Sequence, residues 1–198
     1  MVGSADSNSP QTRPLRRDDW PVIETLFGAN GACGGCWCMW WRVPMGGKTW
    51  GAAKGAPNRR AFRALVESGD ASGVLAFDGD APVGWCSIGP RISFPRVERS
   101  KALAREWHDT TWSLNCLFVP ARARGRGVAT ALVAAAVEFA RTHGATEIEA
   151  YPQAVKSGER PAGAFVWTGV PSLFEPLGFR PIVKPERGRT LFLLSLQP

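Results

Sequence analysis

A long apolar strand that runs through a glycine and arginine-rich turn into an apolar helix sets the architecture of this chain. Residues 112–119 are almost continuously apolar, as is typical of a strand covered on both faces. Beyond the turn, residues 128–143 form an apolar stripe at helical spacing, and Gly144 closes the helix. A second strand follows at 146–151. The sequence therefore predicts a β-α-β unit, with two parallel strands joined by a buried helix.

Shorter elements are expected on either side of this unit. Apolar spacing predicts helices at 19–27 and 57–68, and the glycine-rich stretch 44–56 between them has the composition of a mobile loop. Turn residues at 78–79 and at 187–188 each lie between apolar runs and predict two hairpins. The pattern is that of an α/β protein with added antiparallel strands.

Length and composition fit one domain. A chain of 198 residues, 44% of them hydrophobic, can bury one substantial core but is short for two. Residues 1–12 are rich in Ser, Asn and Pro and have almost nothing to bury, so they are predicted to be a disordered leader. Residues 13–198 are predicted to be a single domain.

Charge and cysteine content limit the compartment and the partners. The formal net charge is +7, which would attract a phosphorylated cofactor, an acidic substrate or nucleic acid without choosing among them. No apolar run approaches the roughly 20 residues of a membrane span, so we expect a cytoplasmic protein with no membrane partner. Five cysteines, an odd number, fit reduced thiols better than a disulfide framework.

The turn between the buried strand and its helix has the chemistry of a phosphate site. Gly125 and Gly127 lack the Cβ atoms that would keep a phosphate away from the backbone, and the amides of the next helical turn point outward. Arg122, Arg124 and Arg126 add positive charge. The Lys-Ser/Thr pair of a nucleotide P-loop is missing. A phosphate-bearing ligand is therefore predicted here.

These residues also carry a resemblance to a known family. Arg122-x-x-Gly125-x-Gly127, preceded by LFVP and followed by an alanine-rich helix, resembles motif A of the GNAT superfamily of acyl-CoA-dependent N-acyltransferases. The expected order of elements agrees from Arg13 to Leu196, and LFEPLGF resembles the family's usual FYEKLGF ending. The resemblance implies an α/β (α+β) fold with a mixed, mostly antiparallel sheet flanked by helices. In that fold, strand 112–119 splays from strand 146–151 and opens a cleft.

The resemblance further implies an enzyme that transfers an acetyl group from acetyl-CoA to a primary amine of a small molecule. The amine would attack the thioester directly in a ternary complex, with no metal. Pantetheine would bind the main chain of the strand, and the turn and helix start would hold the pyrophosphate. The residues expected to bind the cofactor are Leu117, Phe118, Val119, Arg122, Arg124, Gly125, Arg126, Gly127, Val128, Ala129 and Thr130.

The catalytic groups usual in the family are missing from their places. A carboxylate often lies on the strand before the turn, where this chain has Ser113 and Asn115, and a Tyr often lies where this chain has Phe174. His108 is a candidate base because its reference pKa of about 6.5 suits proton removal near neutrality. Tyr151 is a candidate acid, and Asn115, at the place of the usual carboxylate, is the third catalytic candidate. Each has an ordinary structural alternative: an exposed loop histidine, or side chains that only pack in the sheet.

The resemblance also implies that the segment ACGGCWCMWWR, residues 32–42, borders the acceptor side of the cleft, because it follows the first helix. Its spacing C-x-x-C-x-C offers three thiols but no second pair of ligands nearby, so no zinc site is expected, and a redox pair lacks its usual context. Trp37, Trp40 and Trp41 are expected to form an aromatic wall for the acceptor, with Arg42 binding an acidic group on it. The alternative is that these rings fill the core.

Three functions remain open at this level. In the first, the acceptor is a small amine, such as an amino-sugar, a polyamine or an amino acid. In the second, it is a macromolecular amine on a protein or an aminoacyl-tRNA, which the net charge of +7 favours. The third is a non-catalytic acyl-CoA-binding or zinc-containing interaction module. A homodimer is compatible with each of them.

Overall fold

The computed structural model describes residues 10–43, 47–153, 166–183 and 189–196. Seven strands form one sheet in the order β1-β2-β3-β4-β5-β7-β6, in which β4 and β5 are parallel and the other neighbours antiparallel. The predicted fold class is confirmed. The strands are β1 Gln11–Pro14, β2 Gly73–Asp78, β3 Ala81–Pro90, β4 Thr111–Phe118, β5 Glu147–Ala150, β6 Arg180–Val183 and β7 Leu191–Ser195.

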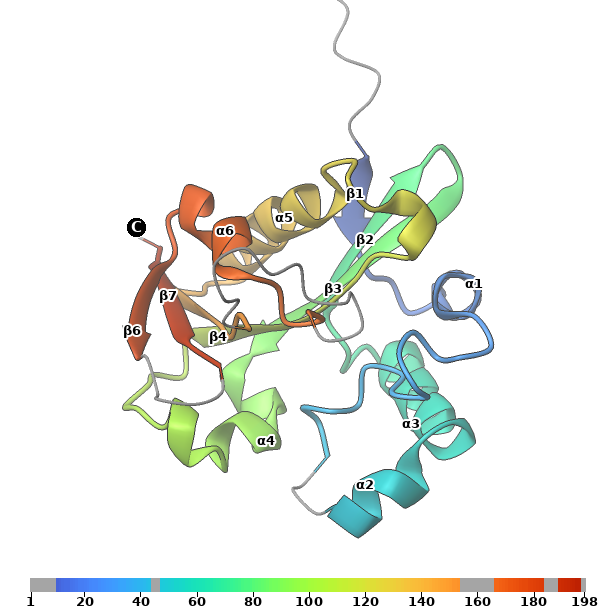
Figure 1. Ribbon diagram of the computed structural model, residues 1–198, viewed down its shortest axis with the longest axis horizontal. Helices are drawn as coiled ribbons and strands as arrows, with labels where there is room; N and C mark the ends of the chain where they lie inside the picture. The colour runs from blue at the N-terminus through green and yellow to red at the C-terminus, as the bar shows by residue number, and fades with distance from the viewer. Residues whose placement is uncertain (1–9, 44–46, 154–165, 184–188, 197–198) are drawn as a thin grey trace, which may run out of the picture.

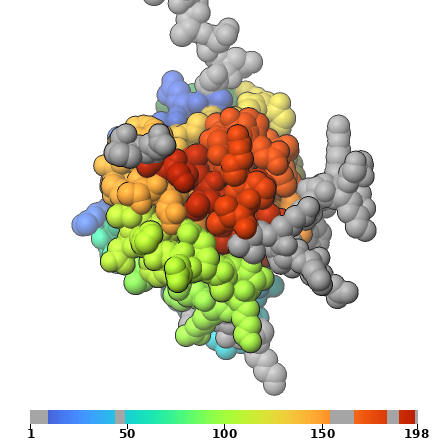
Figure 2. Space-filling model, turned by 90° about the vertical axis from the view of Figure 1, so that its left-hand side faces the viewer, coloured from blue at the N-terminus to red at the C-terminus, as the bar shows by residue number. Residues whose placement is uncertain are grey.

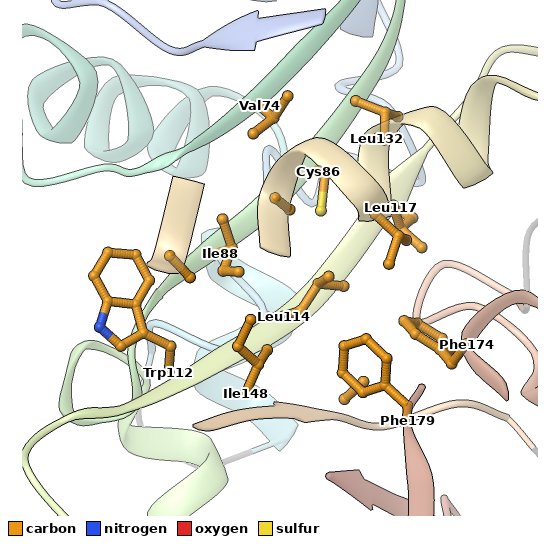
Figure 3. Close-up of a cluster of buried hydrophobic side chains, with 14 of the residues drawn as sticks. Val74, Cys86, Ile88, Trp112, Leu114, Leu117, Leu132, Ile148, Phe174 and Phe179 are labelled. Carbon is orange, nitrogen blue, oxygen red and sulfur yellow. The ribbon is translucent and has the colours of Figure 1, made fainter. Parts of the chain in front are cut away.

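Helices cover both faces of the sheet (Figure 1). They are α1 Trp20–Phe27, α2 Gly47–Ala53, α3 Ala56–Ser68, α4 Pro95–Glu98, α5 Val128–Thr142 and α6 Pro171–Phe174. On one face, α5 and α6 bury the main core, in which Leu132 of α5 and Phe174 of α6 are fully buried (Figure 3). Seen from the side of β6 and β7, α6 lies above the segment that carries α4 (Figure 2).

The opposite face carries two further cores. Helices α1 and α3 pack against β2 and β3 around Phe62 and Trp85, which are both fully buried. Trp41, Tyr151 and residues around α4 form a third, smaller cluster. The segment between α1 and α2 lies between these two clusters, so its side chains enter both of them.

Strands β4 and β5 part halfway along β4. Their parallel pairing runs from Thr111 and Glu147 to Leu114 and Ala150, whereas β4 continues to Phe118 paired only with β3. The register with β3 shifts at the same place, because Ile88 pairs with Leu114 and the next residue, Ser87, pairs with Cys116. Asn115 is therefore an extra residue in β4, a bulge that bends the strand away from β5. This is the predicted splay.

Two details differ from the sequence predictions. Strand β1 begins at Gln11, inside the predicted leader, because its backbone pairs with Phe77 and Ala76 of β2. Residues 1–9 of that leader, and the turn expected at 187–188, lie outside the described residues. The stretch expected to be a mobile loop contains α2, whose two glycines are poor helix formers and concealed the helix. Within the described residues, no helix is long and apolar enough to span a membrane.

Close contact between α5 and β3 requires a glycine at position 84. A Cβ there would lie 2.8 Å from Cδ1 of Leu132 and 2.8 Å from Cγ1 of Val128, whereas real Cβ atoms keep a larger distance from their neighbours. Helix α5 therefore lies on the bare backbone of β3, which fixes the height of the helix start above the sheet.

We predict that Gly84→Ala lowers the free energy of unfolding by about 1–3 kcal/mol, since the added methyl forces packed side chains apart. Urea unfolding measures the loss. The matched control is Gly51→Ala in α2, where a Cβ meets nothing within 4 Å and the change should be neutral or slightly stabilising. Equal stability of Gly84→Ala and the parent would contradict the close packing of α5.

Candidate functional site

Two adjoining cavities lie along β4 where it parts from β5. The outer cavity has a volume of about 540 Å³ and is lined by β4 residues together with the start of α5 and the segment 166–173. The inner cavity has a volume of about 290 Å³ and extends under the segment between α1 and α2. They share the lining residues Ala32, Cys33, Leu117, Phe118 and Trp167. A ligand that enters along β4 therefore passes from one cavity to the other.

The turn before α5 has the geometry of a phosphate cradle. Gly125 and Gly127 adopt φ values of 73° and 74°, a left-handed conformation that other residues rarely take, and a Cβ on either would meet nothing within 4 Å. The open space in front of them is a shallow cavity of about 270 Å³ that reaches Ala129 and Thr130. Amides in the first turn of a helix have no intrahelical partner. The cradle therefore offers donors and room to a phosphate.

The three arginines of this turn have different roles. Arg124 lines the outer cavity, and its Nε donates to the carbonyl of Val119 at 3.0 Å. Arg126 points to the β2–β3 turn, where its Nη2 lies 2.9 Å from Oδ2 of Asp78. Arg122 is exposed and is not among the lining residues. Arg124 is thus the arginine best placed for a phosphate.

The main chain of β4 is partly engaged in the cleft. The amide of Leu117 donates to the carbonyl of Trp167 at 2.6 Å, across the gap that β5 leaves. A ligand that used this amide would have to displace Trp167. Phe118 and Val119, the other two residues predicted to bind the cofactor there, line the outer cavity.

The predicted aromatic wall divides into one cavity residue and two core residues. Trp40 lines the inner cavity, and its ring lies edge-on to Trp50 at 5.0 Å and to Trp167 at 6.1 Å. Trp37 is buried against Trp20 and other rings of the α1–α3 core. Trp41 is buried against Tyr151, and its Nε1 donates to the carbonyl of Asn115 at 2.7 Å. The wall therefore consists of Trp40, Trp50 and Trp167, and Trp37 and Trp41 support the structure behind it.

Two arginines stack on the rings of this wall. Arg96 lies 3.7 Å above the ring centre of Trp40, and Arg189 lies 4.7 Å above that of Trp167. Neither arginine was singled out from the sequence, because both come from segments far from the aromatic stretch. Burial lowers the pKa of both guanidinium groups. Positive charge therefore borders the inner cavity.

The predicted catalytic residues do not meet at the cavities. His108 is exposed and comes before Thr111, where β4 begins to pair with β5. That end of β4 is itself roughly 10 Å of strand away from the splay at Leu114. Tyr151 is fully buried, and its hydroxyl lies 2.7 Å from Oγ of Ser113 and donates to Glu149 at 2.7 Å. Neither residue lines the inner or the outer cavity.

Glu149 is equally committed to internal partners. Its Oε2 accepts from Nε of Arg91 at 2.8 Å, and its other oxygen accepts from Arg105. Burial, and then the charge of Glu149, raise the pKa of Tyr151 well above its usual value, so that the phenol stays protonated. This buried network ties β5 to the segment before β4. It is a structural element beside the site and supplies no free base.

The sequence analysis assigned the cysteines no role in the site. Cys33, Cys36, Cys38 and Cys116 all line the inner cavity. Three come from the aromatic stretch and the fourth from β4, so only the fold brings them together. Among the described residues, no group of three or more His, Cys, Asp or Glu side chains is arranged to hold a metal ion.

A family model and, in the next comparison, solved structures agree with this geometry. The model of the acetyltransferase (GNAT) family matches residues 38–165, which include β4, the glycine turn and α5. No curated protein shows significant similarity to the chain.

Solved structures share the fold at low sequence identity. PaiA N-acetyltransferase from Thermoplasma acidophilum, in complex with coenzyme A, has a TM-score of 0.55 at 11% identity, over 95% of this chain and 99% of that one. YncA from Salmonella typhimurium, with its cofactor acetyl-CoA, has a TM-score of 0.55 at 15% identity, over 96% of this chain and 95% of that one. Ribosomal-protein-alanine N-acetyltransferase from Brucella melitensis has a TM-score of 0.52 at 16% identity, over 94% and 99%.

The division of the tryptophans gives a stability prediction. Trp37→Leu should lower the free energy of unfolding by about 2 kcal/mol or more, because it leaves a void among packed rings. Trp40→Leu should cost less than half as much, since Trp40 faces a cavity that is already open. Urea unfolding of both variants tests this. A greater loss of unfolding free energy in Trp40→Leu than in Trp37→Leu would contradict this assignment of Trp37 to the core and Trp40 to the cavity.

Proposed function

The chain belongs to the acetyltransferase (GNAT) family, and from its two adjoining cavities we propose that it transfers an acetyl group from acetyl-CoA to a primary amine of a small molecule. The observation that carries this proposal is the continuity of three features: the phosphate cradle before α5, the outer cavity along β4 and the inner cavity at its end. They have the order of the parts of acetyl-CoA: pyrophosphate, pantetheine arm and thioester.

The residues present fit such a cosubstrate. Gly125 and Gly127 leave a cradle that any side chain would fill, and the positive end of the α5 dipole favours a diphosphate. Arg124 stands at the rim of the outer cavity. The walls beyond it are the apolar side chains and main chain of residues 117–119, which suit a long, uncharged pantetheine arm. The thioester would then lie where the outer cavity meets the inner one, beside Trp167.

The acceptor would occupy the inner cavity and attack the thioester directly in a ternary complex. Direct attack needs both substrates bound side by side, which two adjoining cavities provide. The inner cavity, about 290 Å³, suits a molecule of amino-acid size rather than a folded protein. The cavity is open to solvent and the chain has a net charge of +7, so a macromolecular amine that reaches into the cavity is the second candidate.

Charge around the inner cavity narrows the class of acceptor. Lys54 lines it, and Arg96 and Arg189 stack on rings that border it. A polyamine would meet repulsion from these cations, whereas a carboxylate on the acceptor would be attracted. The rings of Trp40, Trp50 and Trp167 suit an apolar or aromatic body. An amino acid with a large apolar side chain combines these properties.

Cosubstrate binding is tested by thermal denaturation with and without acetyl-CoA. We expect acetyl-CoA to raise the melting temperature, because a ligand that binds only the folded state stabilises it. Gly127→Glu should abolish the shift by filling the cradle with a side chain and a like charge. Gly144→Glu is the matched control. It changes a glycine of positive φ at the other end of α5, where a Cβ also meets nothing, and should retain the shift relative to its own melting temperature.

A shift that survives in Gly127→Glu would contradict the cradle as the pyrophosphate site. Loss of the shift in both variants would show that the charge acts through the fold and not through the cradle.

The acceptor class is tested by the release of CoA thiol with pairs of amines that differ only in a carboxylate. Tryptophan should be acetylated with a kcat/KM about tenfold or more above that of tryptamine, since a hydrogen-bonded charge contributes about 1.5–3 kcal/mol. Polyamines should be poorer still. A preference for tryptamine would contradict the charge argument. Activity confined to proteins or RNA, with a steep dependence on salt, would favour the macromolecular acceptor.

A further inference from the structure

The base that acetyl transfer needs is missing from the usual place in the strand, and the inner cavity contains an unused candidate. An ammonium acceptor must lose a proton before its nitrogen can attack. Ser113 and Asn115 cannot accept it, and the carboxylate of Glu149 is held by Arg91 and Arg105. The remaining candidates are the thiols that line the cavity.

Cys38 is held in a conformation that places its sulfur against the sheet. Trp37 and Cys38 have φ values of 46° and 57°, two successive residues in the left-handed region where residues other than glycine are strained. Trp37 then enters the α1–α3 core, and the Cys38 side chain reaches β3 and β4. Its Sγ accepts a hydrogen bond from Nε1 of Trp85 at 3.2 Å. The strained backbone at Trp37 and Cys38 therefore holds this sulfur at the inner cavity.

The surroundings of Cys38 are those of an anion. Besides the indole of Trp85, the thiol of Cys116 donates a hydrogen bond to Cys38. The Ser87 hydroxyl has no hydrogen-bond partner among the described residues, and it lies near enough to lower the pKa of Cys38. The sulfur thus accepts from Trp85 and has the Cys116 thiol and the unpartnered Ser87 hydroxyl beside it, an environment that stabilises a thiolate.

A buried cation completes this environment. Nε and Nη2 of Arg42 are buried and have no hydrogen-bond partner within the described part of the chain. Burial lowers the pKa of Arg42, and a negative charge on Cys38 raises it. A buried guanidinium needs a counterion. A Cys38 thiolate would supply it, and Arg42 would then act as the partner of the thiolate rather than bind an acidic group on the acceptor.

The neighbouring thiols keep their protons. The hydrogen bond from Cys116, with the charge of Arg42, lowers the pKa of Cys38 to about 7. Burial and the charge of Cys38 raise the pKa of Cys36 to about 11, and burial raises that of Cys86 well above its usual value. The hydrogen bond to Cys38 and burial likewise raise the pKa of Cys116. Lys54, at the cavity wall, adds positive charge.

We infer that Cys38 is the general base of this enzyme, and that its thiolate takes the proton from the acceptor ammonium in the inner cavity. This inference rests on the proposed function. An N–H bond breaks, an S–H bond forms on Cys38, and the nitrogen keeps the electron pair with which it attacks the thioester carbon. The C–N bond forms, and the C–S bond of acetyl-CoA breaks with its electron pair on the CoA sulfur. Of the two protons that the ammonium loses, one passes through Cys38 to water and the other ends on the CoA thiol.

Cys38→Asn and Cys38→Asp form the test pair, because Asn and Asp tolerate the left-handed backbone and only Asp supplies a base. Cys38→Asn should lower kcat/KM by about 10²-fold or more, and Cys38→Asp should recover a large part of that loss. The wild-type kcat/KM should rise with pH through about 7, as the thiolate forms, and Cys38→Asn should lose that limb. Cys86→Ala, which removes a buried thiol outside both cavities, should keep the wild-type profile.

A second measurement uses the unchanged protein and no substrate. Iodoacetamide alkylation, followed by peptide mass spectrometry, should modify Cys38 at a rate that rises with a midpoint near pH 7, since only the thiolate reacts. A midpoint near the ordinary thiol value of about 8.5 would overturn the inference even if the variants failed to fold.

Two further results would also overturn it. One is a Cys38→Asn enzyme with wild-type kcat/KM and pH profile. The other is acetyl bound to Cys38 after incubation with acetyl-CoA alone, which would make Cys38 a nucleophile. In each case the acetyl-CoA melting shift persists, so the proposed function stands. Absence of the shift in the wild-type protein would contradict the proposed function and the inference together.

Discussion

The separation of β4 from β5 is the constraint on which the rest of the site depends. Pairing ends at Leu114 and Ala150, and the bulge at Asn115 bends β4 while β3 continues to hold it. Without this break, a regular parallel pair would leave no space along β4. Because of it, one end of the strand leads into the glycine turn, the gap forms the outer cavity, and Cys116 is placed at the inner one. The segment at Trp167 reaches across the gap, where its carbonyl accepts from the Leu117 amide.

The parts of the fold that local sequence determines could be predicted. The apolar run of β4, the turn with Gly125 and Gly127, and the stripe of α5 are each encoded within a few residues, so the β-α-β unit and the cradle follow from pattern alone. Helix α2 could not be recognised, since its glycines are typical of loops. The position of the catalytic candidates relative to the cavities could not be predicted for another reason. His108 is near the strand in sequence, but it precedes the end of β4 far from the splay.

The aromatic and cysteine-rich stretch shows what sequence spacing leaves undetermined. Trp37, Trp40 and Trp41 are nearly adjacent, yet they enter the α1–α3 core, the cavity and the Tyr151 cluster respectively. Positive φ angles at Trp37 and Cys38 cause this divergence, and composition gives no sign of them. The partners of the stretch, Cys116 and Trp167, lie far away along the chain. The role of Cys38 therefore becomes visible only when β3 and β4 are seen packed against it.

The most direct test of the central claim is a crystal structure of the protein with acetyl-CoA. Our account predicts the pyrophosphate on the amides of residues 125–129, the pantetheine arm along β4 in the outer cavity, and the thioester at the entrance to the inner cavity, facing Trp40 and Cys38. Acetyl-CoA bound elsewhere, or with its thioester directed away from the inner cavity, would contradict the account.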